Sequence, residues 1–166
     1  MKLTSRIVAG ALLLATPAAF SSGTASATAS ANILTAISLT EAANLAFGDV
    51  TASASSGTVV VSTAGARSVT GGVTASGGTI TNASFTASGT NNHTFSITLP
   101  GDSDVTVSDG SSHSMTVTTF TSNPSSTGTL NGSGSATIAV GATLNVGTSQ
   151  AVGAYTGTFN VTVAYN

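Results

Sequence analysis

Few side chains in this sequence could do chemistry, and they form no recognisable catalytic pattern. His93 and His113 are the only histidines, and a hydrolase would pair one of them with an aspartate and one of the many serines. No Gly-x-Ser-x-Gly elbow lies between an expected strand and a helix, which is where many hydrolases carry the nucleophilic serine. We therefore expect no enzymatic activity, no catalytic residue and no small-molecule substrate.

Three aspartates fall within one expected hairpin and are the best candidates for a metal site. Carboxylate oxygens are ligands that Ca²⁺ prefers. However, the spacing of Asp102, Asp104 and Asp109 does not match a calcium loop, and no glutamate closes it. We expect these aspartates to be solvated turn residues, with no metal and no cofactor. The chain has no cysteine, so no disulfide can hold the fold together.

The start of the chain has the form of a secretory signal peptide. Lys2 and Arg6 precede an apolar run over residues 7–20, and two small-x-small cleavage sites follow, Ala25-Ser26-Ala27 and Ala29-Ser30-Ala31. The run is shorter than the ~20 apolar residues that a membrane-spanning helix needs. We expect residues 1–27 to be removed and the mature chain to pass through the periplasm to the cell surface or the medium.

The charge of the mature chain argues against two classes of partner. After cleavage at Ala27, the chain keeps one basic residue, Arg67. It has five acidic residues: Glu41, Asp49, Asp102, Asp104 and Asp109. The net charge is one minus five, or −4 with neutral histidines. Such a chain has no basic surface for nucleic acid or for anionic membranes. Arg67 could pair with Glu41 or Asp49, but an exposed pair contributes only ~0–1 kcal/mol, so we assign it no function.

Period-two alternation of apolar and polar residues after the signal peptide predicts an all-β fold. No window shows a helical stripe, 40% of residues are apolar, and threonine and valine fill most of the alternating positions. Turn residues separate short strands about every ten residues, which favours an immunoglobulin-like antiparallel β-sandwich. Besides the two terminal segments, we expect strands over residues 45–50, 58–62, 69–75, 80–87, 94–99, 105–107, 115–120 and 136–146.

The two most regular strand patterns lie at the ends of the mature chain. The last one places five apolar residues on a single face: Tyr155, Phe159, Val161, Val163 and Tyr165. The first places another five on one face: Ala29, Ala31, Ile33, Ile37 and Leu39. We expect residues 40–44 to connect the first strand to the sandwich.

Several motifs are similar to those of bacterial pilus subunits. The closing segment over residues 151–165 resembles the "G-x-Y-x-D/G-x-h-x-V-x-V-x-Y/F" strand of archaic chaperone-usher subunits, including the spore coat protein U type. Leu45-Ala46-Phe47-Gly48 resembles their "L-x-F-G" signature. The order of motifs, with residues 65–68 and 141–144, also resembles a related family of exported bacterial proteins filed as a domain of unknown function. That family is the more similar at the first strand, where many spore coat U subunits carry cysteines.

The resemblance implies a structural role in a surface pilus or fimbria-like fibre. In such subunits the sandwich lacks one strand, and the N-terminal extension of the next subunit fills the resulting groove. Here the donor strand would be Ala29 to Leu39 and the groove wall Tyr155 to Tyr165. Residues 1–27 would then be the signal peptide, 28–44 the extension and connector, and 45–166 the sandwich. The implied partners are other copies of the chain, a periplasmic chaperone and an outer-membrane usher.

Two alternatives remain open on the residues alone. The segment from Ala29 to Leu39 could be the first strand of a complete sandwich, because alternation is the same for intrachain and interchain pairing. The chain could also be a monomeric secreted binding module or adhesin that grips a glycan through Asn91, Asn92 and His93. The small number of aromatic residues argues against a glycan platform.

Overall fold

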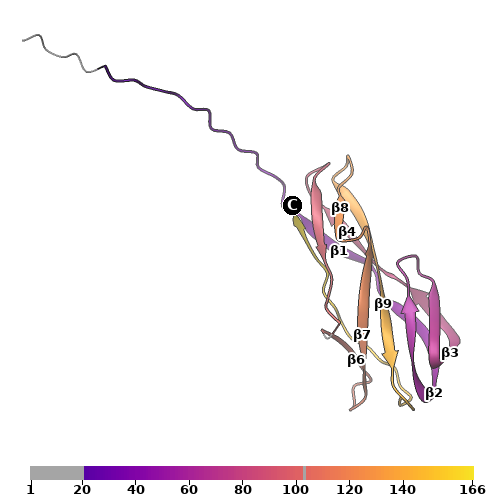
Figure 1. The fold of residues 1–166 in the computed structure, drawn as a ribbon. Helices are drawn as coiled ribbons and strands as arrows, with labels where there is room; N and C mark the ends of the chain where they lie inside the picture. The colour runs from indigo at the N-terminus through magenta and orange to yellow at the C-terminus, as the bar shows by residue number, and fades with distance from the viewer. Residues whose placement is uncertain (1–20, 103) are drawn as a thin grey trace, which may run out of the picture. The chain divides into compact units, whose positions relative to one another are not determined.

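Strands rich in threonine and valine make up the folded part of the chain, because these β-branched side chains pack well on a pleated sheet. The computed structural model describes residues 21–102 and 104–166, and the unit from Ile33 to Asn166 contains all ten strands (Figure 1). This described part contains no helix, and hence none able to cross a membrane. The strands are β1 (Ser38–Ala43), β2 (Ala46–Val61), β3 (Arg67–Thr81), β4 (Ala83–Ser88), β5 (Thr94–Thr98), β6 (Val105–Ser108), β7 (Ser114–Asn123), β8 (Thr127–Thr129), β9 (Ser135–Val146) and β10 (Thr162–Tyr165).

The strands form two antiparallel sheets, which confirms the all-β expectation. The larger sheet has seven strands in the order β1-β4-β9-β2-β3, with β7 pairing to both β9 and β6. Strand β9 is its centre: the first half pairs with β4, the second half with β2, and the other edge with β7. The smaller sheet has the order β10-β5-β8.

Two hydrophobic clusters fill the space between the strands. One is built around Val59, Val117 and Leu144, and the other around Phe95 and Ile138. Burying a side chain of this size contributes about 1.5–3 kcal/mol, so in the absence of disulfides these clusters stabilise the fold. Three partly buried residues pack against both clusters and link them: Leu45, Phe120 and Phe159.

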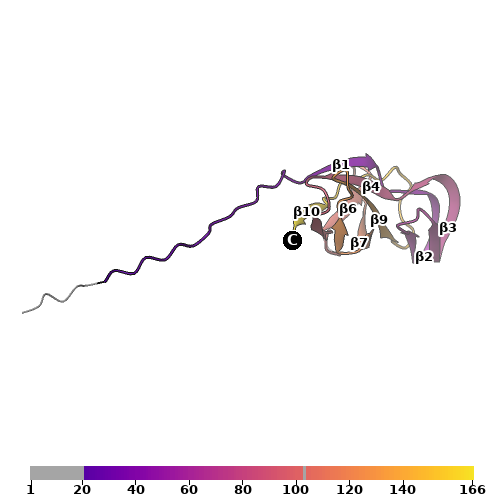
Figure 2. The same cartoon turned by 90° about the horizontal axis from the view of Figure 1, so that it is seen from above.

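The β2–β3 hairpin is long and irregular, and its two halves have different neighbouring strands. Its register breaks at a bulge between Ala52 and Gly57, and β2 runs through this bulge where two separate strands were expected, over residues 45–50 and 58–62. Beyond the break, residues 57–61 join β9, whereas residues 46–52 pair with β3 alone. A Cβ on Gly57 would clash with the carbonyl oxygen of Thr70 on β3, so only glycine fits at the end of the bulge. In the view from above, the hairpin lies to one side of the other strands (Figure 2).

Both terminal strands differ from their expected extents. Residues 40–43, expected as a connector, belong to β1, which pairs with β4 from Ser38 onward. Residues 155–161, expected as strand, form only an isolated bridge between Thr156 and Ser108, and the regular strand begins at Thr162. The reason is the same at both ends: alternation sets which face is apolar, but a strand forms only where a neighbour completes its hydrogen bonds.

Candidate functional site

The strongest candidate site is a place where strand pairing is missing. The first half of β2 has β3 on one edge and, among the strands of residues 21–102 and 104–166, no neighbour on the other. In the described residues, Gly157–Val161 form no strand, and β10 pairs only with β5. We call the gap between the first half of β2 and the segment 150–159 the seam. A sheet edge with unpaired N–H and C=O groups is able to bind another extended chain.

An apolar groove of about 910 Å³ runs along the seam. Its floor is formed by buried side chains of β6, β7 and β9, including Val105, Met115 and Leu144. One wall is residues 44–52, with Phe47 and Val50, and the other is residues 150–157 and Phe159. Asp49 is the single charged residue among the described residues that line the groove, so the groove suits an uncharged, partly apolar occupant.

The C-terminal wall has the side-chain alternation that its sequence predicts. Tyr155, Phe159, Val161, Val163 and Tyr165 are all partly buried, while the residues between them are exposed. The ring of Phe159 packs edge-on against Phe85 with centroids 6.3 Å apart, and against Phe120 at 5.0 Å. These aromatic contacts hold the wall on the core where backbone pairing is absent.

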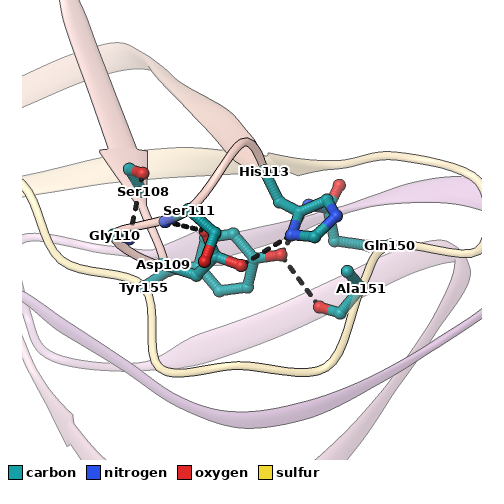
Figure 3. A network of polar contacts seen from close by, with 8 residues as sticks. All are labelled: Ser108, Asp109, Gly110, Ser111, His113, Gln150, Ala151 and Tyr155. Atoms are coloured by element: carbon teal, nitrogen blue, oxygen red, sulfur yellow. Dashed lines mark hydrogen bonds and ion pairs between the residues drawn. The ribbon is translucent and has the colours of Figure 1, made fainter.

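Tyr155 is fixed at one end of the groove by a small polar network (Figure 3). Its hydroxyl donates to the carbonyl oxygen of Ala151 at 2.8 Å and accepts from Nε2 of Gln150 at 2.8 Å. Because Gln150, Ala151 and Tyr155 all line the groove, these bonds set the shape of the loop at that end.

The tip of the β6–β7 hairpin lies against the same loop and carries a hydrogen-bonded pair, Asp109 and His113 (Figure 3). Nδ1 of His113 donates to Oδ2 of Asp109 at 2.7 Å, and the amide of Ser111 donates to the other carboxylate oxygen at 2.9 Å. The hydrogen bond from His113, followed by that from Ser111, lowers the pKa of the Asp109 carboxyl below its usual value. A Cβ on Gly153 would lie 3.1 Å from Cβ of Asp109, so the two segments are in close contact.

The opposite end of the C-terminal segment is tied to the start of the domain. The hydroxyl of Tyr165 donates to the carbonyl oxygen of Thr35 at 2.9 Å and accepts from the amide of Thr90 at 2.6 Å. The ring of His93 packs edge-on against Tyr165, with centroids 5.9 Å apart. Nδ1 of His93 also donates to the carbonyl oxygen of Asn91 at 3.0 Å, so this histidine has a structural contact in the loop considered for a glycan.

The expected donor residues divide into two groups. Ile37 and Leu39 are partly buried against the second hydrophobic cluster of their own chain, and Leu39 pairs with Ala87. Ile33, in contrast, is 94% exposed. Ala29 and Ala31 lie in a segment that contains no strand. The structure therefore brings Ile37 and Leu39 into the domain's own fold and leaves Ile33 exposed.

The three hairpin aspartates do not converge. Asp102 accepts from the amide of Thr119 at 2.6 Å, Asp104 accepts from the amide of Gly101 at 2.8 Å, and Asp109 pairs with His113. Within residues 21–102 and 104–166, no group of three histidine, cysteine, aspartate or glutamate side chains lies close enough to hold a metal ion.

Sequence reasoning missed half of the groove. The wall on β2 and the floor on β6, β7 and β9 were not predicted as site residues, although the L-x-F-G signature falls on that wall at residues 45–48. The available signal was the same alternation that marks any half-buried strand, and this signal does not say which edge lacks a neighbour.

One known protein family matches nearly all of this fold. The model of a family described as a domain of unknown function (DUF4402) matches residues 37–165. The chain belongs to this DUF4402 family. The match begins one residue before β1 and ends at the last residue of β10, so the DUF4402 domain includes every strand and both walls of the groove. No curated protein and no solved structure is significantly similar to the chain.

Proposed function

We propose that this chain is a structural subunit of a bacterial surface fibre, and that copies assemble when an N-terminal strand of one copy enters the seam of the next. The single observation that carries the proposal is the apolar groove between the unpaired edge of β2 and a C-terminal segment that forms no strand. A strand in the seam would extend the sheet at β2, give the C-terminal segment a hydrogen-bonding neighbour and place alternate side chains on the floor, as in β-augmentation.

The packing of β1 restricts the donor to residues before Thr35. Ile37 and Leu39 already pack on their own core, and Thr35 bonds to Thr90 and Tyr165. The donor is then residues 28–34, about 23 Å long when extended, with Ala29, Ala31 and Ile33 facing the groove. Burial of Ile33 contributes about 1.5–3 kcal/mol. The alanines contribute less, so main-chain hydrogen bonds at roughly 0.5–1.5 kcal/mol each must supply much of the affinity.

Two transient partners belong to the proposed assembly route. Before assembly, the empty groove and its open edges would favour aggregation. A periplasmic chaperone would cover the seam, and an outer-membrane usher would exchange the chaperone for the next subunit. The signal-peptide pattern of the first 27 residues fits this route of export.

A truncation and a peptide test the proposal. The mature chain from Thr28 should sediment as multimers. A chain starting at Thr35, which keeps β1 intact, should remain monomeric and melt at a lower temperature than the mature chain. A synthetic peptide of residues 28–34 should raise the melting temperature of the shorter chain, because a ligand that binds only the folded state stabilises it. A peptide with the same composition in scrambled order is the control.

The opposite result would favour the monomeric binding module. If the mature chain melts cooperatively as a monomer at every concentration, and the peptide has no effect, then the seam does not bind this strand. Glycan binding through the loop at Asn91, Asn92 and His93 would then be the function to test.

A further inference from the structure

Arg67 reaches far along the β2–β3 hairpin from its own position. It opens β3 opposite Val61, yet its Nη1 donates to the carbonyl oxygens of Phe47 at 3.0 Å, Asp49 at 3.1 Å and Gly77 at 3.0 Å. Residues 49 and 61 would be about 40 Å apart in a straight strand. An arginine side chain covers only a small part of that length, so these bonds require the hairpin to double back at the bulge over residues 53–56.

The three carbonyl groups lie where the hairpin ladder is irregular. The β2–β3 register shifts between Phe47 and Asp49, and again between Asp49 and Val50. Nη1 carries two hydrogens for three acceptors, so at least one hydrogen is shared. The guanidinium is charged at every ordinary pH, and in the described part of the chain neither Asp49 nor Glu41 forms an ion pair with it. Main-chain oxygens are therefore what this cation binds.

Arg67 also explains the glycine of the L-x-F-G signature. Gly48 has a φ of +72°, and a Cβ at this position would lie 2.5 Å from Nη1 of Arg67 and 2.6 Å from the carbonyl oxygen of Gly77. The guanidinium thus occupies the space that a side chain at residue 48 would need. Two sequence motifs that are separate in the chain, at residues 45–48 and 65–68, meet at this contact.

We propose that Arg67 is a positioning residue that holds the β2 wall of the groove in place for an incoming strand. Phe47, Gly48 and Asp49 line the groove, and the first half of β2 has no second neighbouring strand to fix it. Arg67 joins this half of the hairpin to the half that is anchored on β9, and so sets the width of the seam. The inference rests on the proposed strand-binding function.

Hydrogen exchange on the monomer fraction of the full mature chain tests this role. In Arg67→Met, the amides of residues 46–52 should exchange about tenfold faster, the scale expected from losing charge-assisted hydrogen bonds, while the amides of β9 keep their wild-type rates. Arg67→Lys retains the charge and some of the bonds, so its rates should lie between those of Arg67→Met and the wild type. The fraction of chain that sediments as multimers should fall in the same order.

Gly48→Ala and Gly110→Ala form a matched pair for the same test. Both glycines have a positive φ, +72° and +79°, but a Cβ on Gly110 meets nothing within 4 Å. Only Gly48→Ala should therefore reproduce the fast exchange of residues 46–52.

Two results would overturn the role of Arg67: unchanged exchange at residues 46–52 in folded Arg67→Met, or an equal rise at β9, which would indicate general destabilisation. If the wild-type chain never forms multimers, the proposed function fails. The exchange rates still decide whether Arg67 holds the wall.

Discussion

The Asp109–His113 hydrogen bond lies within the tip of the β6–β7 hairpin, which packs against the loop at the end of the groove. Folding lowers the pKa of the Asp109 carboxyl, mainly through the hydrogen bond from His113. The charged carboxylate therefore stabilises the fold at pH values above its unfolded pKa, and this contribution is lost as the pH falls through the lower, folded pKa. Nothing in the sequence predicted the pair, because residues four apart in a hairpin tip can point in any direction.

Asp109→Asn should therefore lower the melting temperature slightly at neutral pH, where the wild-type carboxylate is charged. The difference between the two proteins should shrink as the pH falls, because protonation removes the same charge from the wild type. Thermal melting across the acidic range measures this, with Glu41→Gln as a control that removes a negative charge from an exposed strand position. A difference that stays constant with pH would show that the carboxylate charge is not the cause.

Gly128 gives a second prediction at the scale of one residue. A Cβ at this position would clash with the ring of Phe95, which is fully buried. Gly128→Ala should reduce the free energy of unfolding by about 1–3 kcal/mol, as overpacking of a core does. Gly132→Ala is the matched control, since a Cβ there meets nothing within 4 Å. Equal stabilities of the two variants in denaturant unfolding would contradict the packing described for β8.

At the scale of elements, the sequence predicted which face of a segment is buried better than it predicted where regular strands begin and end. The alternation of residues 155–165 gives the correct buried face throughout, but only Thr162–Tyr165 forms regular strand. The L-x-F-G stretch was correctly expected to be extended, whereas the bulge over residues 53–56 was not expected. Side-chain period depends on the residue sequence alone, while pairing and bulges depend on which segments meet.

The boundary between the donor and β1 can be tested with two isoleucines four residues apart. Ile33 is 94% exposed, whereas Ile37 packs on the core of its own chain. Ile37→Ala should reduce the free energy of unfolding by about 1–2 kcal/mol, less than for a fully buried isoleucine. Ile33→Ala should leave the monomer's unfolding unchanged but reduce the fraction that sediments as multimers. Assembly that survives Ile33→Ala would place the donor elsewhere.

At the scale of the whole molecule, the fold of the described domain is complete except along one seam. The sequence indicated an exported all-β chain, and the structure and the DUF4402 match support the fold and the family. Sequence alone could not locate the missing strand, because the β2 wall, the floor and the C-terminal wall come from segments up to about a hundred residues apart. Their alternation is equally consistent with a closed sandwich.

Disulfide trapping between copies tests strand insertion most directly, because the chain has no cysteine of its own. A chain carrying Ile33→Cys is mixed with a chain carrying Val50→Cys, whose side chain lines the groove. The control partner carries Thr51→Cys: Thr51 also borders the groove, but its side chain is exposed on the opposite face of β2, where its hydroxyl bonds to Ser76. A disulfide requires the two Cα atoms to approach within about 7 Å, so the bond reports direct insertion.

We expect a disulfide-linked pair of chains, on mild oxidation, for Ile33→Cys with Val50→Cys and far less for Ile33→Cys with Thr51→Cys. Equal yields for the two mixtures, or no linked pair in either, would show that the strand before Thr35 does not enter the seam of another copy.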